Sequence, residues 1–153
     1  CYALKGRYMF KNTKSAHQLR QESLSHPQWV EAMAVQIKRQ KWFRWHDAGD
    51  LQSVQHLKNI ISVCKLTPGT MHWLPTREAQ ILKEFTPDMI PTNLIIRLSS
   101  HMINQGPVKQ WPHTSTVTDG EGRTCPAPDQ GGICGSCRSC WDRDTKNVCY
   151  GKH

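Results

Sequence analysis

The chain has 153 residues, a net charge of +8, a hydrophobic fraction of 37% and a mean hydropathy of −0.62. This size suits one domain with a moderate core, and the basic balance suits an anionic partner such as nucleic acid or a phosphate-bearing cofactor. No apolar run approaches the roughly 20 residues that span a membrane, and no secretory signal is evident. Because the chain opens on Cys1 rather than Met, we expect a fragment of a longer protein.

The first part of the chain predicts helices. Residues 1–25 are polar and basic and are expected to be helical in part. Pro27 suits the first turn of a second helix. The apolar residues that follow it have roughly helical spacing: Trp29, Val30, Met33, Val35 and Ile37.

From residue 41 onward, strand-like and helix-like segments alternate. Short aromatic or apolar runs predict strands at 41–47, 70–76 and 93–99. Apolar residues at helical spacing predict helices at 51–65 and 77–85, between those strands. This alternation is typical of βα units that form a mainly parallel sheet.

Beyond residue 100 this alternation gives way to Gly, Pro and polar residues and then to a cysteine-rich end. We therefore predict an α/β fold with two parts. Residues 1–104 would form a partial (βα) barrel-like parallel sheet. Residues 105–153 would form a C-terminal Cys-rich cluster-binding segment packed on that sheet.

Polar side chains accompany the ends of the three predicted strands. In parallel α/β folds the carboxyl ends of the strands share one edge, and ligands bind there. Aspartates in these positions have an alternative role, because they can cap the helix that follows. Taken as a set, the residues predict one cofactor-binding site. Its members are His46, Asp47, Asp50, His72, Arg77 and His101.

Seven cysteines are present, and four of them fall within residues 125–140. An odd total argues against a complete disulfide framework. Clustered cysteines in a chain without a secretory signal indicate metal ligands in a reducing compartment. We therefore expect a metal centre near the C-terminus and no membrane association.

Three of these cysteines follow the pattern Cys134-x2-Cys137-x2-Cys140. Thiolates at this spacing can hold three corners of a 4Fe–4S cluster. Zinc is the alternative, although structural zinc usually takes two separate Cys pairs and Cys137 would here belong to both. The fourth ligand is Cys125 or Cys149, since eight residues separate each from the run. We favour Cys125, because Cys149 lies in a strand-like segment that would lead the chain away.

Several stretches carry a family resemblance: Cys1-Tyr2-Ala3, the segment Arg44–Ser53, the segment His72–Glu78 and the Cys-rich end. They resemble the gene product 88 family of phages and plasmids, over nearly the whole chain. A phage or plasmid origin implies the cytoplasm of a bacterial host.

In that family the region that ends in Cys1-Tyr2-Ala3 is similar to the cluster motif of radical S-adenosylmethionine enzymes. Those enzymes use a full or partial (βα) barrel, and three cysteines hold a 4Fe–4S cluster whose open iron binds S-adenosylmethionine. The resemblance therefore implies an enzyme of this kind, truncated so that only Cys1 of the motif is present. His46, Asp47 and Asp50 would contact cofactor or substrate, and Arg77 would pair with an anionic group. Cys1 would belong to a separate cluster or join the C-terminal ligands.

Two functions stay open. The first is an iron–sulfur protein that resembles radical S-adenosylmethionine enzymes and acts on a small molecule or a nucleic acid. The second is a non-catalytic iron–sulfur or zinc module that binds nucleic acid through its basic surface. Salt-dependent binding of DNA or RNA without affinity for S-adenosylmethionine would support the second.

Overall fold

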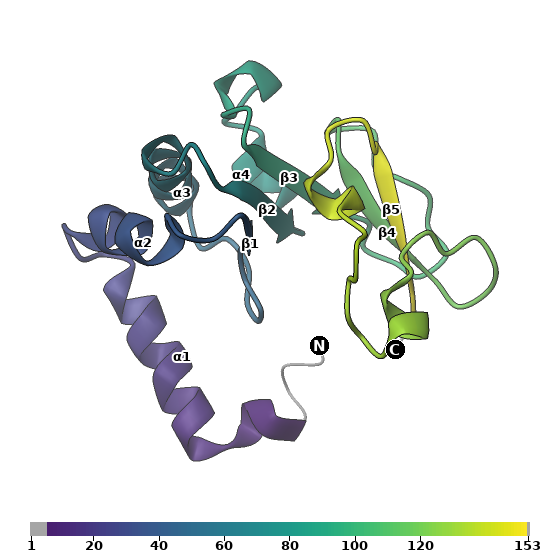
Figure 1. The fold of residues 1–153 in the computed structure, drawn as a ribbon, viewed down its shortest axis with the longest axis horizontal. Coiled ribbons are helices and arrows are strands. Elements are labelled where there is room, and N and C mark those ends of the chain that lie inside the picture. Colours follow the sequence, from purple (N-terminus) through teal and green to yellow (C-terminus); the bar gives the residue numbers. More distant parts are fainter. Residues whose placement is uncertain (1–5, 153) are drawn as a thin grey trace.

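The computed structural model describes residues 6–152, in which five strands form one parallel sheet. The order of the strands in the sheet is their order in the chain, and the sheet curls into a half-barrel (Figure 1). The strands are β1 (Trp42–Arg44), β2 (Met71–Thr76), β3 (Leu94–Ser99), β4 (Thr114–Thr118) and β5 (Asn147–Gly151).

Helices connect the first three strands and cover one face of the sheet (Figure 1). The α-helices are α1 (Lys11–Ser23), α2 (Trp29–Ile37), α3 (Val54–Leu66) and α4 (Ala79–Leu82). Short 3-10 helices are η2 (Gly6–Met9), η3 (Pro87–Met89), η4 (Ala127–Gln130) and η5 (Ser139–Trp141). Among the described residues, no helix combines the length and the apolar character needed to cross a membrane.

The prediction of at least three parallel strands joined by helices is confirmed. Two elements are shorter than predicted: β1 covers 42–44 rather than 41–47, and α4 covers 79–82 rather than 77–85. β1 stops early because the next residues leave the extended conformation: His46 has φ +54° and Gly49 has φ +84°.

β4 was not predicted from the sequence, because Thr114–Thr118 lacks the apolar run that marks a buried strand. Polar pairs support this strand instead. The Thr114 hydroxyl donates to the Asn147 side chain at 2.9 Å, and the Asn147 amide donates to the Thr116 hydroxyl at 3.0 Å. The β-branched threonines also suit a pleated strand.

The two faces of the sheet have different cores. In β3, Leu94, Ile96 and Leu98 face the helices and join the main hydrophobic cluster. Because successive side chains in a strand alternate between faces, Ile95 and Arg97 lie on the other, inner face. A second, smaller cluster occupies that inner face, and it includes side chains from the Cys-rich segment.

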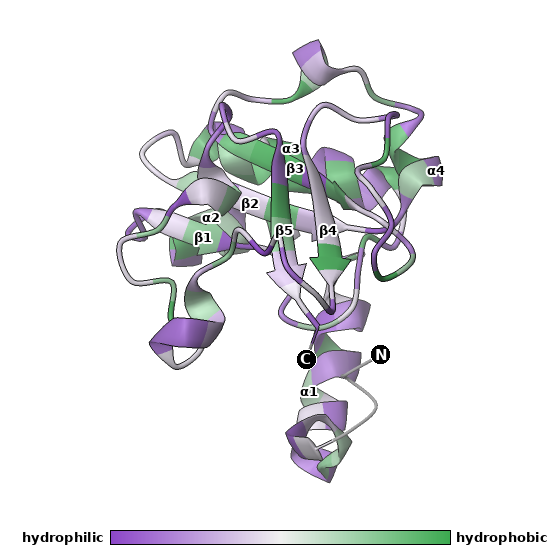
Figure 2. Ribbon diagram, turned by 90° about the vertical axis from the view of Figure 1, so that its right-hand side faces the viewer, coloured by the Kyte–Doolittle hydropathy of each residue, from purple (hydrophilic) through white to green (hydrophobic). Residues whose placement is uncertain are grey.

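α1 stands apart from both cores. Within the described residues it buries none of its side chains, and Figure 2 shows it projecting from the body with much of its surface hydrophilic. The Tyr8 hydroxyl of the preceding η2 donates to the Asp47 carboxylate at 2.9 Å. This hydrogen bond connects the N-terminal part to the loop after β1.

Two buried histidines make the fold sensitive to acid. Burial is the largest cause that lowers the pKa of His56 and of His72 to about 4. An unfolded chain has histidine pKa values of about 6.5, so it binds more protons than the folded chain between these values. Stability is therefore fully present above about pH 6.5 and is lost as the pH falls toward 4.

We expect the free energy of unfolding to fall by about 2 kcal/mol per buried histidine between pH 7 and pH 5. Urea unfolding at the two pH values measures this difference. The variant His72→Gln should show a difference smaller by about 2 kcal/mol than the wild type. An identical pH dependence in the variant and the wild type would contradict the account.

Candidate metal centre on the inner face of the sheet

The Cys-rich segment connects β4 to β5 and packs on the inner face of the sheet. Trp73, Cys140 and Val148 form the buried centre of this packing, and Cys125, Trp141 and Tyr150 lie against it. One small apolar recess is lined by four cysteine side chains and their neighbours. The four cysteines are Cys125, Cys134, Cys137 and Cys140.

A buried arginine holds the segment in place. Arg97 of β3 is 0% exposed, and its guanidinium donates to six backbone carbonyls at 2.6–3.5 Å. Five of them lie between residues 139 and 146, which include the ligand candidate Cys140. The acceptors are the carbonyls of Thr114, Ser139, Cys140, Asp142, Thr145 and Lys146. No role was predicted for Arg97 from the sequence. A charged residue inside the apolar run Leu94–Leu98 could have indicated a buried hydrogen-bonding role.

Trp141 attaches the C-terminal end of η5 to the sheet. The Trp141 indole N–H donates to the Phe43 carbonyl of β1 at 3.0 Å. Its ring packs edge-to-face on Trp73 and on Trp42, with centroid distances of 5.2 and 5.9 Å. The ligand segment is therefore attached to β1, β2 and β3.

The two better-buried thiols of the Cys-x2-Cys-x2-Cys run have different environments. Burial raises the pKa of Cys140 to about 11, and the Tyr150 hydroxyl lies 3.2 Å from its sulfur. Burial also raises the pKa of Tyr150, so this hydroxyl stays neutral and can donate to a sulfur. The pKa of Cys137 is lowered, chiefly by hydrogen bonding to Ser139. Cys137 is therefore the more readily deprotonated of the two thiols. The thiolate is the form that binds metals.

Cys149 faces away from the recess. Val148 and Tyr150 contact the inner cluster, and Cys149 lies between them on β5. Successive side chains in a strand point to opposite faces, so the Cys149 side chain lies on the outer face of the sheet. Its backbone still positions Cys125, because the Cys125 N–H donates to the Cys149 carbonyl at 3.0 Å.

The loop that carries Cys134 and Cys137 is tightly turned and exposed. The Cys137 N–H donates to the Cys134 carbonyl at 3.0 Å, and Gly135 between them has φ +56°. This left-handed conformation favours glycine at position 135. The recess below the loop holds about 10 Å³, which is room for about one water molecule. A cluster would have to be accommodated by outward movement of this exposed loop.

Three residues of the predicted cofactor site, Asp50, Arg77 and His101, lie together at the carboxyl edge of the sheet. The Asp50 carboxylate accepts hydrogen bonds from the Thr76 hydroxyl at 2.6 Å and from the Arg77 N–H at 2.8 Å. The Arg77 guanidinium in turn donates to the His101 carbonyl at 2.6 Å. The loops after β1, β2 and β3 are thus directly connected. Asp50 does not cap α3, because Ser53 takes that position and its hydroxyl accepts from the His56 N–H.

Two histidines of the predicted set need separate comment. The expectation that His72 lies at a carboxyl strand end is wrong: it is the second residue of β2, is 0% exposed, and packs among the helix-side aromatics. Its Nε2 lies 2.9 Å from the Thr67 hydroxyl. His46 does follow β1, beside Asp47, and its ring lies 5.4 Å from that of His56. Burial lowers the pKa of His46, and neither of its ring nitrogens has a hydrogen-bond partner among the described residues.

The bridge made by Asp50 yields a test of this edge. Asp50→Ala should lower the free energy of unfolding by about 1–3 kcal/mol, because the Thr76 hydroxyl and the Arg77 N–H lose their acceptor. Glu84→Ala, at an exposed position beyond α4, should change it by less than about 0.5 kcal/mol. Urea unfolding of both variants measures the difference. Equal stabilities would show that the bridge contributes nothing.

Comparison with protein families gives one match: the model of the family described as Gene product 88 covers residues 1–143. The chain belongs to the gene product 88 family. No curated protein and no solved structure matched the chain. The gene product 88 match includes all four cysteines of the recess and ends before Cys149. Cys1 also falls within the match but lies outside the described residues.

Proposed function

We propose that this gene product 88 protein is an iron–sulfur protein that holds one 4Fe–4S cluster on the inner face of its half-barrel. The ligands would be the thiolates of Cys125, Cys134, Cys137 and Cys140. The observation that carries the proposal is that these four thiols line one recess while Cys149 faces the other side of the sheet. A cluster at this position would tie the C-terminal segment to three strands.

Ligand spacing in the sequence favours a cluster over zinc. A zinc ion needs about four donors, with each sulfur about 2.3 Å from the same ion. The four thiolates of a cubane bind four different irons, so they stand farther apart. In the Cys-x2-Cys-x2-Cys spacing Cys137 would have to belong to two zinc-type pairs, whereas it can hold one corner of a cubane.

The number of ligands bears on the role of such a cluster. Four thiolates would occupy every iron, which suits electron transfer or structural support rather than binding of S-adenosylmethionine. Chemistry of the radical S-adenosylmethionine type would need a second, three-cysteine cluster that includes Cys1. We propose that S-adenosylmethionine would then bind at the carboxyl edge formed by Asp50, Arg77 and His101. The parallel half-barrel is a suitable scaffold for this arrangement.

Two cysteine variants test the ligand assignment. Cys125→Ala should remove nearly all absorbance near ~400 nm, where thiolate-bound clusters absorb. Cys149→Ala should leave that absorbance largely intact, since this thiol faces away. Both proteins are purified without oxygen and compared at equal concentration. Loss of the cluster in Cys149→Ala but not in Cys125→Ala would overturn the assignment.

A calorimetric titration separates the two parts of the proposal. The chain as it stands, with its C-terminal cluster loaded, should not bind S-adenosylmethionine. Binding that is lost with Cys137→Ala in the present chain would contradict the auxiliary role of the C-terminal cluster.

A further inference from the structure

We propose that single-stranded nucleic acid binds at the free edge of β1, with a base stacked on Trp42, whose side chain lies on the inner face, and with phosphates held by surrounding cations. We call this the β1 edge surface. It comprises Lys38, Arg39, Lys41, Trp42, Arg44 and Arg138. The proposal does not rest on the iron–sulfur cluster, because five of these six residues lie outside the Cys-rich segment.

The cations of the β1 edge surface are available to an anion. Lys38, Arg39, Lys41 and Arg44 are exposed; Arg138 is half-buried, and its Nη1 already donates to the carbonyls of Gly135 and Cys137, which leaves the rest of its guanidinium for an anion. In residues 6–152 the structure contains a single ion pair, Arg123–Asp129, which is not part of this surface. The five cations therefore have no carboxylate partner within the described part of the chain. A phosphate backbone is the ligand that neutralises closely spaced cations of this kind.

Cations lie over the ring of the tryptophan at the centre of the surface. Trp42 is half-buried, with the Arg138 guanidinium 5.4 Å and the Lys41 ammonium 5.9 Å from its ring centroid, and a stacked base would take the place of one of them. Trp141 packs edge-to-face against the Trp42 ring on the same inner face, with a centroid distance of 5.9 Å. Next to it, Arg44 covers Trp73 at 4.8 Å. Alternating aromatic rings and cations are the pattern by which single strands are bound.

The position in the sheet favours a single strand over a duplex. β1 is the first strand in the sheet order, so no strand of residues 6–152 pairs with one of its two sides. Stacking on Trp42 needs an unpaired base with a free face, which a duplex does not offer. The basic run that ends in Lys41 leads directly into Trp42. Phosphates on both sides of one stacked base can therefore reach cations.

Two elements of the surface come from different parts of the chain. Arg138 lies between Cys137 and Cys140, whereas Lys41 precedes β1 and Arg44 is its last residue. When the cysteine loop is ordered, Arg138 therefore adds one cation to the surface. The other cations of the surface do not depend on that loop. Loss of the metal should weaken binding only partly, whereas loss of Trp42 should weaken it strongly.

The test is a fluorescence-anisotropy titration of the whole chain with fluorescein-labelled dT20 and rU20. Affinity should fall about twentyfold between 50 and 200 mM salt, as about three neutralised phosphates on a single strand require. Trp42→Ala should weaken binding about tenfold or more, and Trp42→Phe should restore most of it. The exposed pair Lys41→Gln and Arg44→Gln should weaken binding and reduce the salt dependence, without removing a core side chain.

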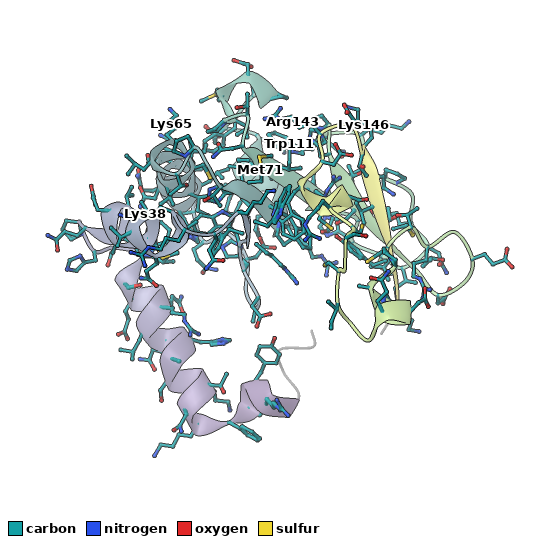
Figure 3. The ribbon with its side chains drawn as sticks, viewed as in Figure 1. Lys38, Lys65, Met71, Trp111, Arg143 and Lys146 are labelled. Carbon is teal, nitrogen blue, oxygen red and sulfur yellow. The ribbon has the colours of Figure 1, made fainter. Side chains whose placement is uncertain are left out.

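A charge-matched control pair is available elsewhere on the molecule. Lys65, at the end of α3, and Lys146, beside β5, point outward in Figure 3 and lie away from β1. Lys65→Gln with Lys146→Gln should bind dT20 within about twofold of the wild type. The proposal is overturned if the wild type does not bind either oligonucleotide, if it binds a duplex of equal length more tightly, or if both double variants weaken binding equally.

Discussion

Cys137→Ala is expected to abolish the cluster, with complete loss of the brown absorbance near ~400 nm in protein purified without oxygen. Cys137 is the central thiol of the run and lines the recess with the other three. Its pKa is also lowered, so it supplies thiolate readily. A cubane with two of its three closely spaced ligands left cannot be held by this loop.

Ser136→Ala is the matched control for Cys137→Ala. Ser136 is the preceding residue in the same exposed loop and does not line the recess. This variant should retain the absorbance of the wild type. If Cys137→Ala keeps its colour, or if both variants lose it, the ligand role of Cys137 is wrong.

Arg97→Met is expected to have the largest effect on stability, a loss of about 3–5 kcal/mol in the free energy of unfolding. The side chain is fully buried and serves six carbonyls. Methionine replaces the aliphatic stem of arginine but is shorter and donates no hydrogen bond, and each buried carbonyl left unpaired costs about 1–3 kcal/mol before relaxation. Because Cys140 is held by this network, the variant should also load less cluster.

Urea unfolding without oxygen measures this loss, and two further variants sharpen it. Arg97→Lys keeps a cation with three donors in place of five, so its stability should be intermediate. Arg123→Met removes the exposed ion pair with Asp129 and should cost less than about 1 kcal/mol. An Arg97→Met protein as stable as Arg123→Met would show that the buried network has no net value.

The first half of the sheet was predictable from sequence because its signals are local. Leu94–Leu98 is a continuous apolar run, and helices between such runs lead to parallel pairing. β4 was not predictable in this way, since its threonines are paired through Asn147, which lies about thirty positions later. A contact at that separation leaves no periodic pattern in either segment.

The candidate site shows the same division. Residue spacing identified the Cys-x2-Cys-x2-Cys run and placed Asp50 and Arg77 at one edge. Spacing alone could not place Cys149, because its distance from the run equals that of Cys125, whereas the structure puts the Cys149 side chain on the face of β5 opposite the recess. His72 was misplaced although the predicted strand 70–76 already put it near the amino end, and in the structure it is the second residue of β2.

Metal and sulfide analysis of the whole chain purified without oxygen tests the central claim most directly. The account predicts about four iron atoms and about four acid-labile sulfides per chain, with zinc well below one equivalent. A colourless protein with one equivalent of zinc and no sulfide would contradict it.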